Sequence, residues 1–146
     1  MLTVKPIEKE DAAALEDTSY QAMSPESRLQ MIGDSNQKTH NGNYFEFFKV
    51  LVDDTVVGFM NLYAHSAHII SCGPEIKPAY QRLGYAYAAE KLVLSMAKEK
   101  GYTIAVGAVR EENTASRALH EKLGFEVDRI YTNSHGRKMC LYIKAL

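Results

Sequence analysis

The sequence of 146 residues lacks tryptophan, has only four prolines and two cysteines, and carries no excess charge, with 17 basic and 18 acidic side chains. Cys72 and Cys140 form no Cys-x-x-Cys pair and do not group with the five histidines, which argues against a disulfide framework and a metal site. A formal charge of -1 gives no overall field that would attract nucleic acid or an anionic membrane. An anionic ligand must therefore be held by a local site.

Long hydrophobic runs are also missing. No apolar stretch approaches the roughly 18 to 20 residues that cross a bilayer, and the N-terminus becomes charged within a few residues. We therefore expect a soluble, unprocessed protein in the reducing cytoplasm. The length suits one core, so residues 1–146 are predicted to form a single domain.

Turn-forming residues divide the chain into strands and helices without repeats or low-complexity tracts. The predicted strands cover residues 2–7, 44–52, 56–65, 68–76, 102–109, 125–131 and 137–145. The predicted helices cover residues 8–23, 24–33, 84–100 and 113–123. Ser24 is the expected N-cap of the second helix and Gly33 its stop, and Asp53-Asp54 is expected to close a hairpin. The order is β-α-α-β-β-β-α-β-α-β-β.

The six residues "QRLGYA", numbers 81–86, stand where a strand ends and a long helix begins. The first turn of a helix has unpaired N–H groups at the positive end of the helix dipole, which can hold a phosphate. Gly84 would let a pyrophosphate approach the backbone, and Gln81 and Arg82 could add side-chain donors. Alone, the six residues are equally compatible with an ordinary strand-to-helix turn. They match neither a Walker loop nor a dinucleotide fingerprint.

A second segment, "NTASRALHEKLGF" at residues 113–125, follows after a helix and a strand. With "QRLGYA", it resembles the GCN5-related N-acetyltransferase (GNAT) family, whose acyl-CoA loop reads Gln/Arg-x-x-Gly-x-Gly/Ala. The resemblance covers residues 44–131. It implies an α/β (α+β) fold with a mixed, mostly antiparallel central sheet flanked by helices. It also implies transfer of an acetyl group from acetyl-CoA to a primary amine, without a metal.

The resemblance implies that coenzyme A binds between the splayed strand, the turn after it and the later helix. The residues that it assigns to cofactor binding are Pro74, Glu75, Ile76, Gln81, Arg82, Leu83, Gly84, Tyr85, Ala86, Asn113 and Ser116. Asn113 and Ser116 also fit an ordinary helix cap, and both roles can hold together. Ala115, Ala118, Leu119 and Leu123 have the spacing of a core-facing stripe.

His120 departs from the family pattern, which usually has a tyrosine there to protonate the departing thiolate of coenzyme A. Asn113, Ser116 and His120 are spaced to share one helical face. Three interpretations of His120 stay open: a substitute general acid, a neutral hydrogen-bond donor to the sulfur, or a bystander. A bystander would leave thiolate protonation to solvent, or mean that activity has been lost.

The general base is equally open. Many family members have a glutamate near the end of the strand before the later helix, where this sequence has Ala108. Glu75 is the better candidate, although an outward-facing strand carboxylate or bulk water in the role of base fits as well. The N–H of Ile76 is our choice for the donor that polarises the thioester carbonyl. No cysteine is expected to form an acyl-enzyme.

The acceptor site is expected near Tyr20, Met23, Arg28, residues 36–43 and the last hairpin, at residues 131–137. A small amine and a peptide end both fit, and single acids such as Asp34 or Glu46 could hold an ammonium group. His65 and His68 are predicted to be turn or sheet-face residues rather than metal ligands. The aromatic stretch at residues 44–52 is either a strand of the core and sheet face or part of a sheet that pairs between subunits in a homodimer.

Three functions therefore remain to be compared with the structure. The first is an N-acetyltransferase of small-molecule or peptide amines that uses acetyl-CoA. The alternatives are an acyltransferase for a longer acyl-CoA and a non-catalytic module that binds coenzyme A. A plain structural domain without a cofactor would leave the turn at residues 81–86 without a chemical reason.

Overall fold

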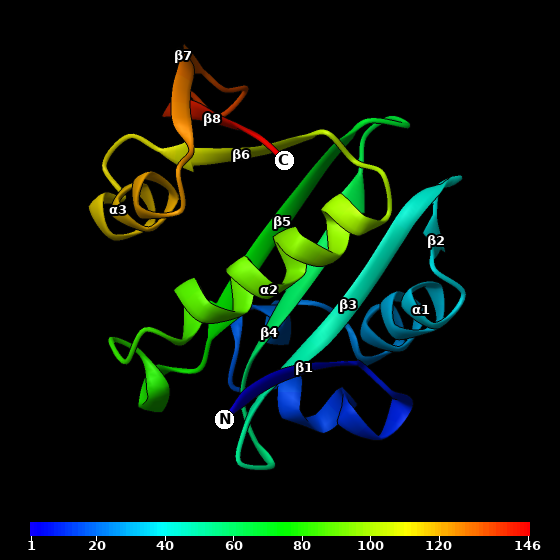
Figure 1. The fold of residues 1–146 in the computed structure, drawn as a ribbon. Coiled ribbons are helices and arrows are strands. Elements are labelled where there is room, and N and C mark those ends of the chain that lie inside the picture. Colours follow the sequence, from blue (N-terminus) through cyan, green and yellow to red (C-terminus); the bar gives the residue numbers. More distant parts are fainter.

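The computed structural model describes all of residues 1–146, which form a mixed sheet with helices on both faces (Figure 1). The strands are β1 (Leu2–Pro6), β2 (Thr39–His40), β3 (Asn43–Val52), β4 (Thr55–Ala64), β5 (Ile69–Ile76), β6 (Ile104–Arg110), β7 (Glu126–Thr132) and β8 (Lys138–Ala145). The α-helices are α1 (Pro25–Asn36), α2 (Tyr85–Glu99) and α3 (Thr114–Lys122). Three short 3-10 helices are η1 (Lys9–Leu15), η2 (Ser19–Ala22) and η3 (Pro78–Tyr80).

The strands pair in the order β1-β3-β4-β5-β6-β8-β7, and the two-residue strand β2 adds to the end of β3. Every pair is antiparallel except β5 with β6. The predicted α/β class, with a mixed and mostly antiparallel sheet flanked by helices, is therefore confirmed. The predicted hairpin is also confirmed, and Asp53 and Asp54 turn it with φ of 48° and 70°.

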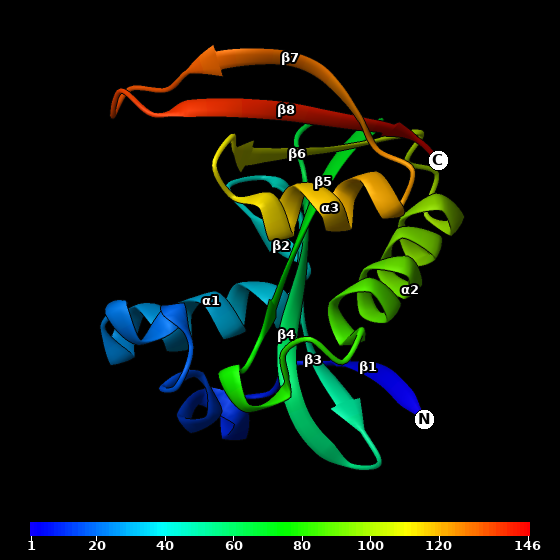
Figure 2. The ribbon, with the colours of Figure 1, turned by 90° about the vertical axis from the view of Figure 1, so that its left-hand side faces the viewer.

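β5 and β6 separate soon after they meet. They pair only over Ile69–Ser71 and Ile104–Val106, although β5 continues to Ile76 and β6 to Arg110. Each strand keeps its antiparallel partner to its end, β4 for β5 and β8 for β6. The sheet therefore splits into two parts, and Figure 2 shows β6, β7 and β8 turning away across the end of β3, β4 and β5.

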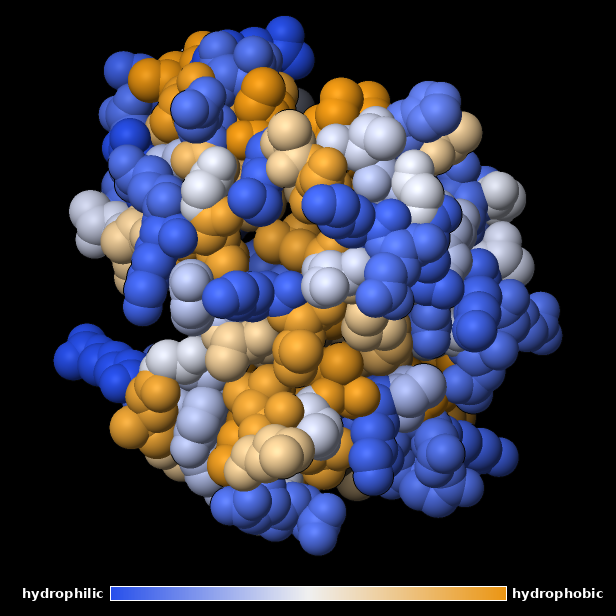
Figure 3. Space-filling model, viewed as in Figure 1, coloured by the Kyte–Doolittle hydropathy of each residue, from blue (hydrophilic) through white to orange (hydrophobic).

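α2 covers one face of the sheet, and Figure 2 shows α1 on the opposite side. Ala89, Val93 and Ala97 of α2 are fully buried against the strands, so the apolar side of this helix faces the core as predicted. In Figure 3, hydrophobic side chains remain visible beside α2, where half-buried residues such as Leu2 and Val4 pack against this core. No helix in the structure combines the length and the apolarity that crossing a membrane requires.

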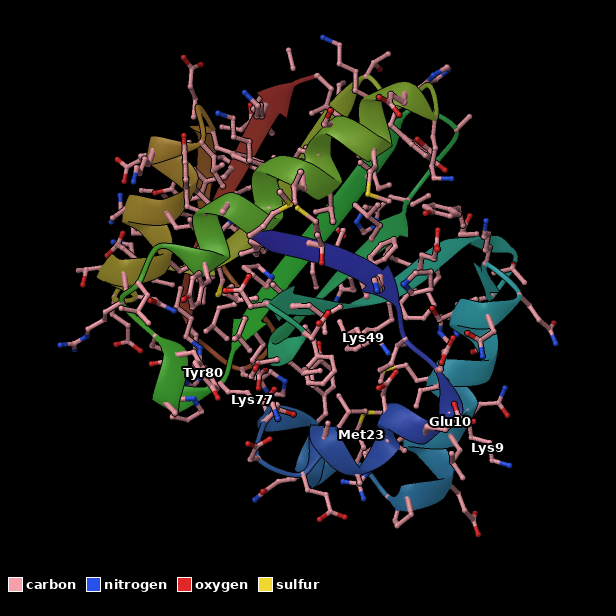
Figure 4. All side chains as sticks on the ribbon, turned by 60° about the horizontal axis from the view of Figure 1, so that its bottom comes forward. Lys9, Glu10, Met23, Lys49, Lys77 and Tyr80 are labelled. Carbon is pink, nitrogen blue, oxygen red and sulfur yellow. The ribbon has the colours of Figure 1, made fainter.

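α1 and η1 cover the other face. Leu15 and Ile32 pack against Phe47 of β3 in a second buried cluster. Lys49 reaches from β3 toward η1, where its Nζ lies 3.0 Å from Oδ2 of Asp11 (Figure 4). This largely buried ion pair holds the N-terminal segment, through η1, against the sheet.

The prediction of one helix over residues 8–23 is wrong, because two 3-10 helices, η1 and η2, replace it. Thr18 interrupts the predicted helix. Its Oγ1 accepts a hydrogen bond from the N–H of Tyr20, so Thr18 is the N-cap of a separate helix, η2. The predicted stop of α1 at Gly33 is also wrong. Ser35 lies beyond it and is buried, and its Oγ accepts a hydrogen bond from the N–H of Phe47 at 2.7 Å, so β3 holds the last turn of α1.

The aromatic-rich strand β3 lies between β1 and β4 in the interior of the sheet. Its backbone groups pair with a neighbouring strand on each side, so it has no free edge for a second subunit. The interpretation of residues 44–52 as a core strand is therefore correct, and any pairing of this sheet with a second subunit would have to use another strand.

Gly58→Ala tests how tightly β4 and β5 fit at the end of β5. A Cβ at Gly58 would lie 2.4 Å from the carbonyl oxygen of Glu75 and 2.9 Å from the Cα of Ile76. Because backbone must move to admit it, we expect the free energy of unfolding in urea to fall by about 1 to 3 kcal/mol. Gly33→Ala is the control, since its Cβ would meet nothing within 4 Å and alanine favours a helix. Equal stability of the two variants would contradict this packing.

Candidate active site

A cleft of about 580 Å³ opens where β5 and β6 diverge. The end of β5, the turn before α2 and one face of α3 bound it, and Figure 3 shows the surface indented between α3 and that turn. Ten of the residues predicted to bind the cofactor line this cleft: Pro74, Glu75, Ile76, Gln81, Arg82, Gly84, Tyr85, Ala86, Asn113 and Ser116. Leu83 does not line it, and its side chain is 60 % exposed.

Alternate residues of β5 direct backbone groups toward the cleft. The N–H of Lys77 donates to the carbonyl of Val57 at 2.9 Å, and β4 and β5 pair without a bulge. In such a ladder the odd-numbered residues of β5 face β4, whereas Pro74 and Ile76 turn their backbone groups toward the diverging β6. Gln81 Nε2 donates to the carbonyl of Ile76 at 3.0 Å. The N–H of Ile76 and the carbonyl of Pro74 remain on the cleft side.

The turn before α2 exposes several backbone N–H groups. Arg82 and Gly84 both have left-handed backbones, with φ of 64° and 82°. The first intrahelical bond of α2 runs from the N–H of Ala88 to the carbonyl of Gly84, so Tyr85 and Ala86 have no intrahelical acceptor. Gly84 offers no capping side chain, and no acidic residue lies in the first turn. This arrangement is suited to an anion such as a phosphate.

α3 forms the opposite wall of the cleft. Asn113 is the N-cap, as predicted, and its Oδ1 accepts a hydrogen bond from the N–H of Ser116 at 3.1 Å. The prediction that Ala115 and Ala118 face the core is wrong, since both are exposed and line the cleft. His120 occupies the core side of the helix instead. The two small side chains leave room along this wall.

Basic and aromatic residues form a group at the outer part of the cleft that no motif in the sequence predicts. Lys122 Nζ lies 4.3 Å from the ring centre of Tyr87, and Lys91 Nζ lies 5.9 Å from the same ring. Tyr87 and Lys122 line the cleft, as does Tyr80, which Figure 4 shows on the segment between β5 and α2. Only folding brings α2 and α3 together here, so local spacing could not reveal the group.

His120, the predicted general acid, is 6 % exposed and does not line the cleft. Its Nδ1 carries a proton, because it lies 2.8 Å from the carbonyl oxygen of Ser116, which can only accept. The ring packs against Phe125 and Tyr142, with ring centres 5.0 and 5.2 Å away. Nε2 lies beside Gly107, where a Cβ would be 2.8 Å from it. Gly107 directly follows the last β6 residue that pairs with β5.

Glu75, the predicted base, lines the cleft and also binds η2. Its carboxylate accepts hydrogen bonds from the N–H of Ser19, at 2.5 Å, and from the Ser19 hydroxyl. Burial raises the pKa of the neighbouring Tyr20, the Asn61 side chain opposes that shift and the charge of Glu75 adds to it. Ala108, where the family often has a glutamate, is exposed on β6 and supplies no carboxylate.

A second hollow, of about 720 Å³, lies on the other face of the sheet. Its lining residues come from η2, α1, β2, β3, β4 and β5: Met23, Ser27, Gln30, Met31, Asp34, His40, Phe45, Asn61, Tyr63 and Ser71. Met23, which was predicted in the acceptor site, lies beside the short helices in Figure 4. Arg28 is buried, and neither it nor the β7–β8 turn, which were also predicted in the acceptor site, lines this hollow.

Asp34 supplies a fixed negative charge in the second hollow. His40 Nδ1 lies 2.7 Å from its Oδ2, and Gln30 Nε2 donates to its Oδ1 at 2.8 Å. These hydrogen bonds, that of His40 first, lower the pKa of Asp34. Glu46, the other acid considered for an ammonium group, is buried and accepts a hydrogen bond from Tyr44 at 2.6 Å, away from this hollow.

Glu90 of α2 is a buried acid that no sequence pattern indicated. It is 0 % exposed, Cys72 Sγ donates to its Oε1 at 3.1 Å, and its Oε2 has no hydrogen-bond partner. Burial raises the pKa of Glu90, while the Cys72 hydrogen bond and the charge of His120 oppose the shift. Burial, with Glu90 adding, raises the pKa of the Cys72 thiol well above its ordinary value. The thiol is therefore protonated and a poor nucleophile.

Metal ligands do not gather anywhere in the structure. No three His, Cys, Asp or Glu side chains lie close enough together to hold a metal ion. His65 and His68 lie exposed in the turn between β4 and β5. The chemistry of the cleft therefore has to be explained from backbone N–H groups and the side chains described above.

The fold is that of an α/β protein in which two neighbouring strands of the sheet diverge. The cleft beside them is suited to a ligand with an anionic group. The family model described as "Acetyltransferase (GNAT) domain" matches residues 2–126, which include β5, α2, β6 and α3. The chain therefore belongs to the GNAT acetyltransferase family, as the sequence motifs predicted. No curated protein matches the sequence significantly.

Solved structures share the fold at low sequence identity. The yncA protein of Salmonella typhimurium, solved with its cofactor acetyl-CoA, has a TM-score of 0.82 and 16 % identity, covering 100 % of this chain and 94 % of that one. An acetyl transferase of Salmonella typhimurium that modifies the N-terminal serine of ribosomal protein L7/L12 has a TM-score of 0.84 and 13 % identity, covering 99 % and 95 %. Ribosomal-protein-alanine N-acetyltransferase of Brucella melitensis has a TM-score of 0.84 and 17 % identity, covering 99 % of each chain.

The buried carboxyl of Glu90 predicts a pH-dependent effect of Glu90→Gln. The pKa of Glu90 is raised in the folded state, so its protonated carboxyl contributes to the stability of wild type relative to this variant. This contribution is complete at pH values below the unfolded pKa and is lost as pH rises through the folded pKa. We therefore expect the variant to gain on wild type in urea unfolding free energy as pH rises from 4 to 8. A difference that stays constant over this range would show that Glu90 does not titrate with folding.

Proposed function

We propose that this chain is an N-acetyltransferase that transfers the acetyl group of acetyl-CoA to a primary amine of a small molecule or peptide. Residues 1–146 then form one acyl-CoA N-acyltransferase domain. The observation that carries the proposal is that the same strand, β5, contributes side chains to both hollows. Glu75 lines the cleft, Ser71 lines the second hollow, and the residue between them on the same strand face is Gly73, which has no side chain.

Coenzyme A would occupy the cleft. The backbone N–H groups from Arg82 to Ala86 would bind its pyrophosphate, while the pantetheine arm would pair with Pro74 and Ile76 in place of the departed β6. Because the Gln81 side chain already donates to Ile76, it positions the turn as well as facing the ligand. The structurally similar yncA protein was solved with acetyl-CoA, which supports this choice of cofactor.

The proposed reaction uses direct attack in a ternary complex. Glu75, directly or through water, takes a proton from the acceptor ammonium, and the amine nitrogen then attacks the thioester carbon. The N–H of Ile76 donates to the carbonyl oxygen as it becomes negative. The nitrogen loses its second proton to water as the C–S bond breaks, and His120 gives a proton to the departing thiolate. Cys72 takes no part as a nucleophile, since its thiol is buried and protonated.

The acceptor would enter through the second hollow. His40, Phe45 and Tyr63 form an aromatic group there, with ring centres 5.8 to 6.4 Å apart, and Asp34 supplies a negative charge. This combination suits an amine that carries an apolar group, such as the end of a peptide or a small aromatic amine. The two free cysteines, Cys72 and Cys140, are compatible with a reducing cytoplasm.

Gly84→Glu should abolish acetyl-CoA binding. Its carboxylate would stand at the N–H groups that hold the pyrophosphate, and we expect affinity measured by calorimetry to fall at least about 100-fold, or about 2.7 kcal/mol. Gly101→Glu is the matched control, because Gly101 also has a positive φ and open space around it but lies at the other end of α2. Equal binding by wild type and both variants would refute the phosphate site.

Glu75→Gln should lower kcat by about 10- to 100-fold with little change in acetyl-CoA affinity, as expected for a general base. Thiol release from acetyl-CoA with a mixed panel of amines measures it. Ser19→Ala removes the hydroxyl hydrogen bond to Glu75 but keeps the backbone N–H bond and the carboxylate, so it should cost less activity. If Ser19→Ala costs as much as Glu75→Gln, Glu75 serves to hold η2 rather than to accept a proton.

Two other functions make different predictions in the same assays. A non-catalytic module that binds coenzyme A is favoured by the burial of His120 and by Ala108, and it would bind acetyl-CoA without releasing thiol. An acyltransferase for a longer acyl-CoA would turn over the longer thioester faster than acetyl-CoA. Failure of wild type to bind any acyl-CoA would refute all three.

A further inference from the structure

The second hollow carries negative charge without a fixed positive partner. Asp34 is the only carboxylate among its lining residues, and no lysine or arginine lines it. The Asp34 side chain is 21 % exposed, and none of the ion pairs that lysines form in the structure involves it. A cationic ligand in this hollow would therefore meet an acid whose charge no lysine or arginine of the protein neutralises.

The Asp34 carboxylate is held in one orientation. Gln30 Nε2 donates to its Oδ1 at 2.8 Å, and His40 Nδ1 lies 2.7 Å from its Oδ2. Each carboxylate oxygen can accept a further hydrogen bond, so the group can still receive a donor from a ligand. Asp34 also lies in the last turn of α1, where the negative end of the helix dipole disfavours an acid. Helix stability alone therefore does not account for an acid at this position.

Aromatic rings adjoin this carboxylate. The ring centre of His40 lies 5.8 Å from that of Phe45 and 6.2 Å from that of Tyr63. The faces of aromatic rings attract cations, so rings beside a carboxylate are suited to an ammonium or guanidinium group. A carboxylate favours the charged form of an ammonium bound to it, and a charged nitrogen cannot attack a thioester. The cation that fits Asp34 is therefore one that keeps its proton while another nitrogen reacts.

The strands beneath the hollow relate Asp34 to Glu75. On this face of the sheet, β3, β4 and β5 contribute successive rows of paired residues: Phe45, Tyr63 and Ser71, then Phe47, Asn61 and Gly73, then Lys49, Phe59 and Glu75. His40, which holds Asp34, packs against the first row, and Glu75 ends the third. Ser71 and Glu75 are four residues apart on β5, so about 13 Å separates the two rows at about 3.3 Å per residue.

The middle row leaves space for a chain between these two ends. Asn61 lines the hollow, so the hollow extends along the sheet to the row beside that of Glu75. Gly73 has no side chain, and the atoms nearest to a Cβ built there, all of them in Asn61, would be 3.6 to 4.0 Å away. A linear molecule that crosses Gly73 can therefore have one end at Asp34 and the other at Glu75.

We propose that Asp34 determines acceptor specificity by binding a second cationic group of the acceptor, about 13 Å from the primary amine that is acetylated beside Glu75. This inference rests on the proposed acetyl transfer. The acceptor is then a linear amine with a positive charge at each end. An aliphatic diamine and a peptide with an N-terminal amine and a basic side chain share this chemistry. Because Asp34 binds the end that does not react, it contributes to KM more than to kcat.

The first test compares acceptors of wild type by thiol release from acetyl-CoA. A chain advances about 1.2 Å per bond, since a peptide residue of three bonds advances about 3.3 to 3.6 Å, so diaminodecane spans about 13 Å. Aminodecanol has the same length with a hydroxyl in place of one amine, and diaminobutane has two amines too close together. We expect kcat/KM for diaminodecane to exceed both by at least about 10-fold, as for a hydrogen bond between charged groups. Equal values for diaminodecane and aminodecanol would overturn the proposal.

The second test removes the charge of Asp34. Asp34→Asn should raise the KM for diaminodecane at least about 10-fold with kcat nearly unchanged, and should leave kcat/KM for aminodecanol within about twofold. Asp54→Asn is the matched control, because it removes one negative charge from the exposed β3–β4 turn, outside the hollow, and should change neither acceptor. A merely structural Asp34 predicts equal losses with both acceptors, and that result would contradict the proposal.

A third comparison distinguishes the two sources of this chemistry. In an extended peptide, the ammonium of a lysine at the third residue lies about 13 Å from the N-terminal amine. Such a peptide is compared with its glutamine counterpart on wild type and on Asp34→Asn. A gain from lysine that disappears in the variant identifies a peptide acceptor, whereas the same dependence only for diaminodecane identifies a small diamine. If Asp34 favours neither compound, the proposal falls.

Failure of the proposed function is a separate outcome. If wild type releases no thiol with any acyl-CoA or amine, acetyl transfer is refuted. Calorimetry of diaminodecane with wild type and Asp34→Asn then still decides whether Asp34 binds a cation, and we expect affinity to fall at least about fivefold in the variant. If wild type turns over aminodecanol and diaminodecane equally well, the enzyme stands and the role of Asp34 falls.

Discussion

The structure depends on one interruption of backbone hydrogen bonding, the divergence of β5 and β6 after three residue pairs. Two antiparallel ladders compete there, because β4 holds β5 to its end and β8 holds β6 to its end. Backbone groups that are buried without a hydrogen-bond partner are costly, so the part of β5 that no longer pairs with β6 needs other partners. Gln81 satisfies one carbonyl, and the remaining groups of Pro74 and Ile76 line a cleft. The interruption of the sheet thereby opens a cleft.

The same divergence connects the two faces of the sheet. α2 and α3 enclose the cleft on one face, while α1 and η2 enclose the second hollow on the other. Glu75 lines the cleft and is held by Ser19, so its position depends on the N-terminal segment as well as on β5. A core acid, Glu90, lies behind the point where the strands separate.

Local signals predicted the turn and the caps well, because they depend on a few neighbouring residues. Gly84 is left-handed at the start of α2, and Asn113 caps α3 through the N–H of Ser116. Spacing on a helix was less informative, since it shows that residues share a face without showing what that face meets. Ala115 and Ala118 have core spacing but line the cleft, whereas His120 lies in the core.

The sequence by itself determined the family, the order of strands and helices after residue 23, and ten of the residues around the cleft, because each motif is continuous in the chain. Tertiary structure alone decided which groups from different segments meet. It joined Cys72 to Glu90 by a hydrogen bond, tied Glu75 to Ser19, and brought Lys122 over Tyr87. These contacts depend on how helices cross a twisted, divided sheet, and that geometry has no counterpart in local spacing.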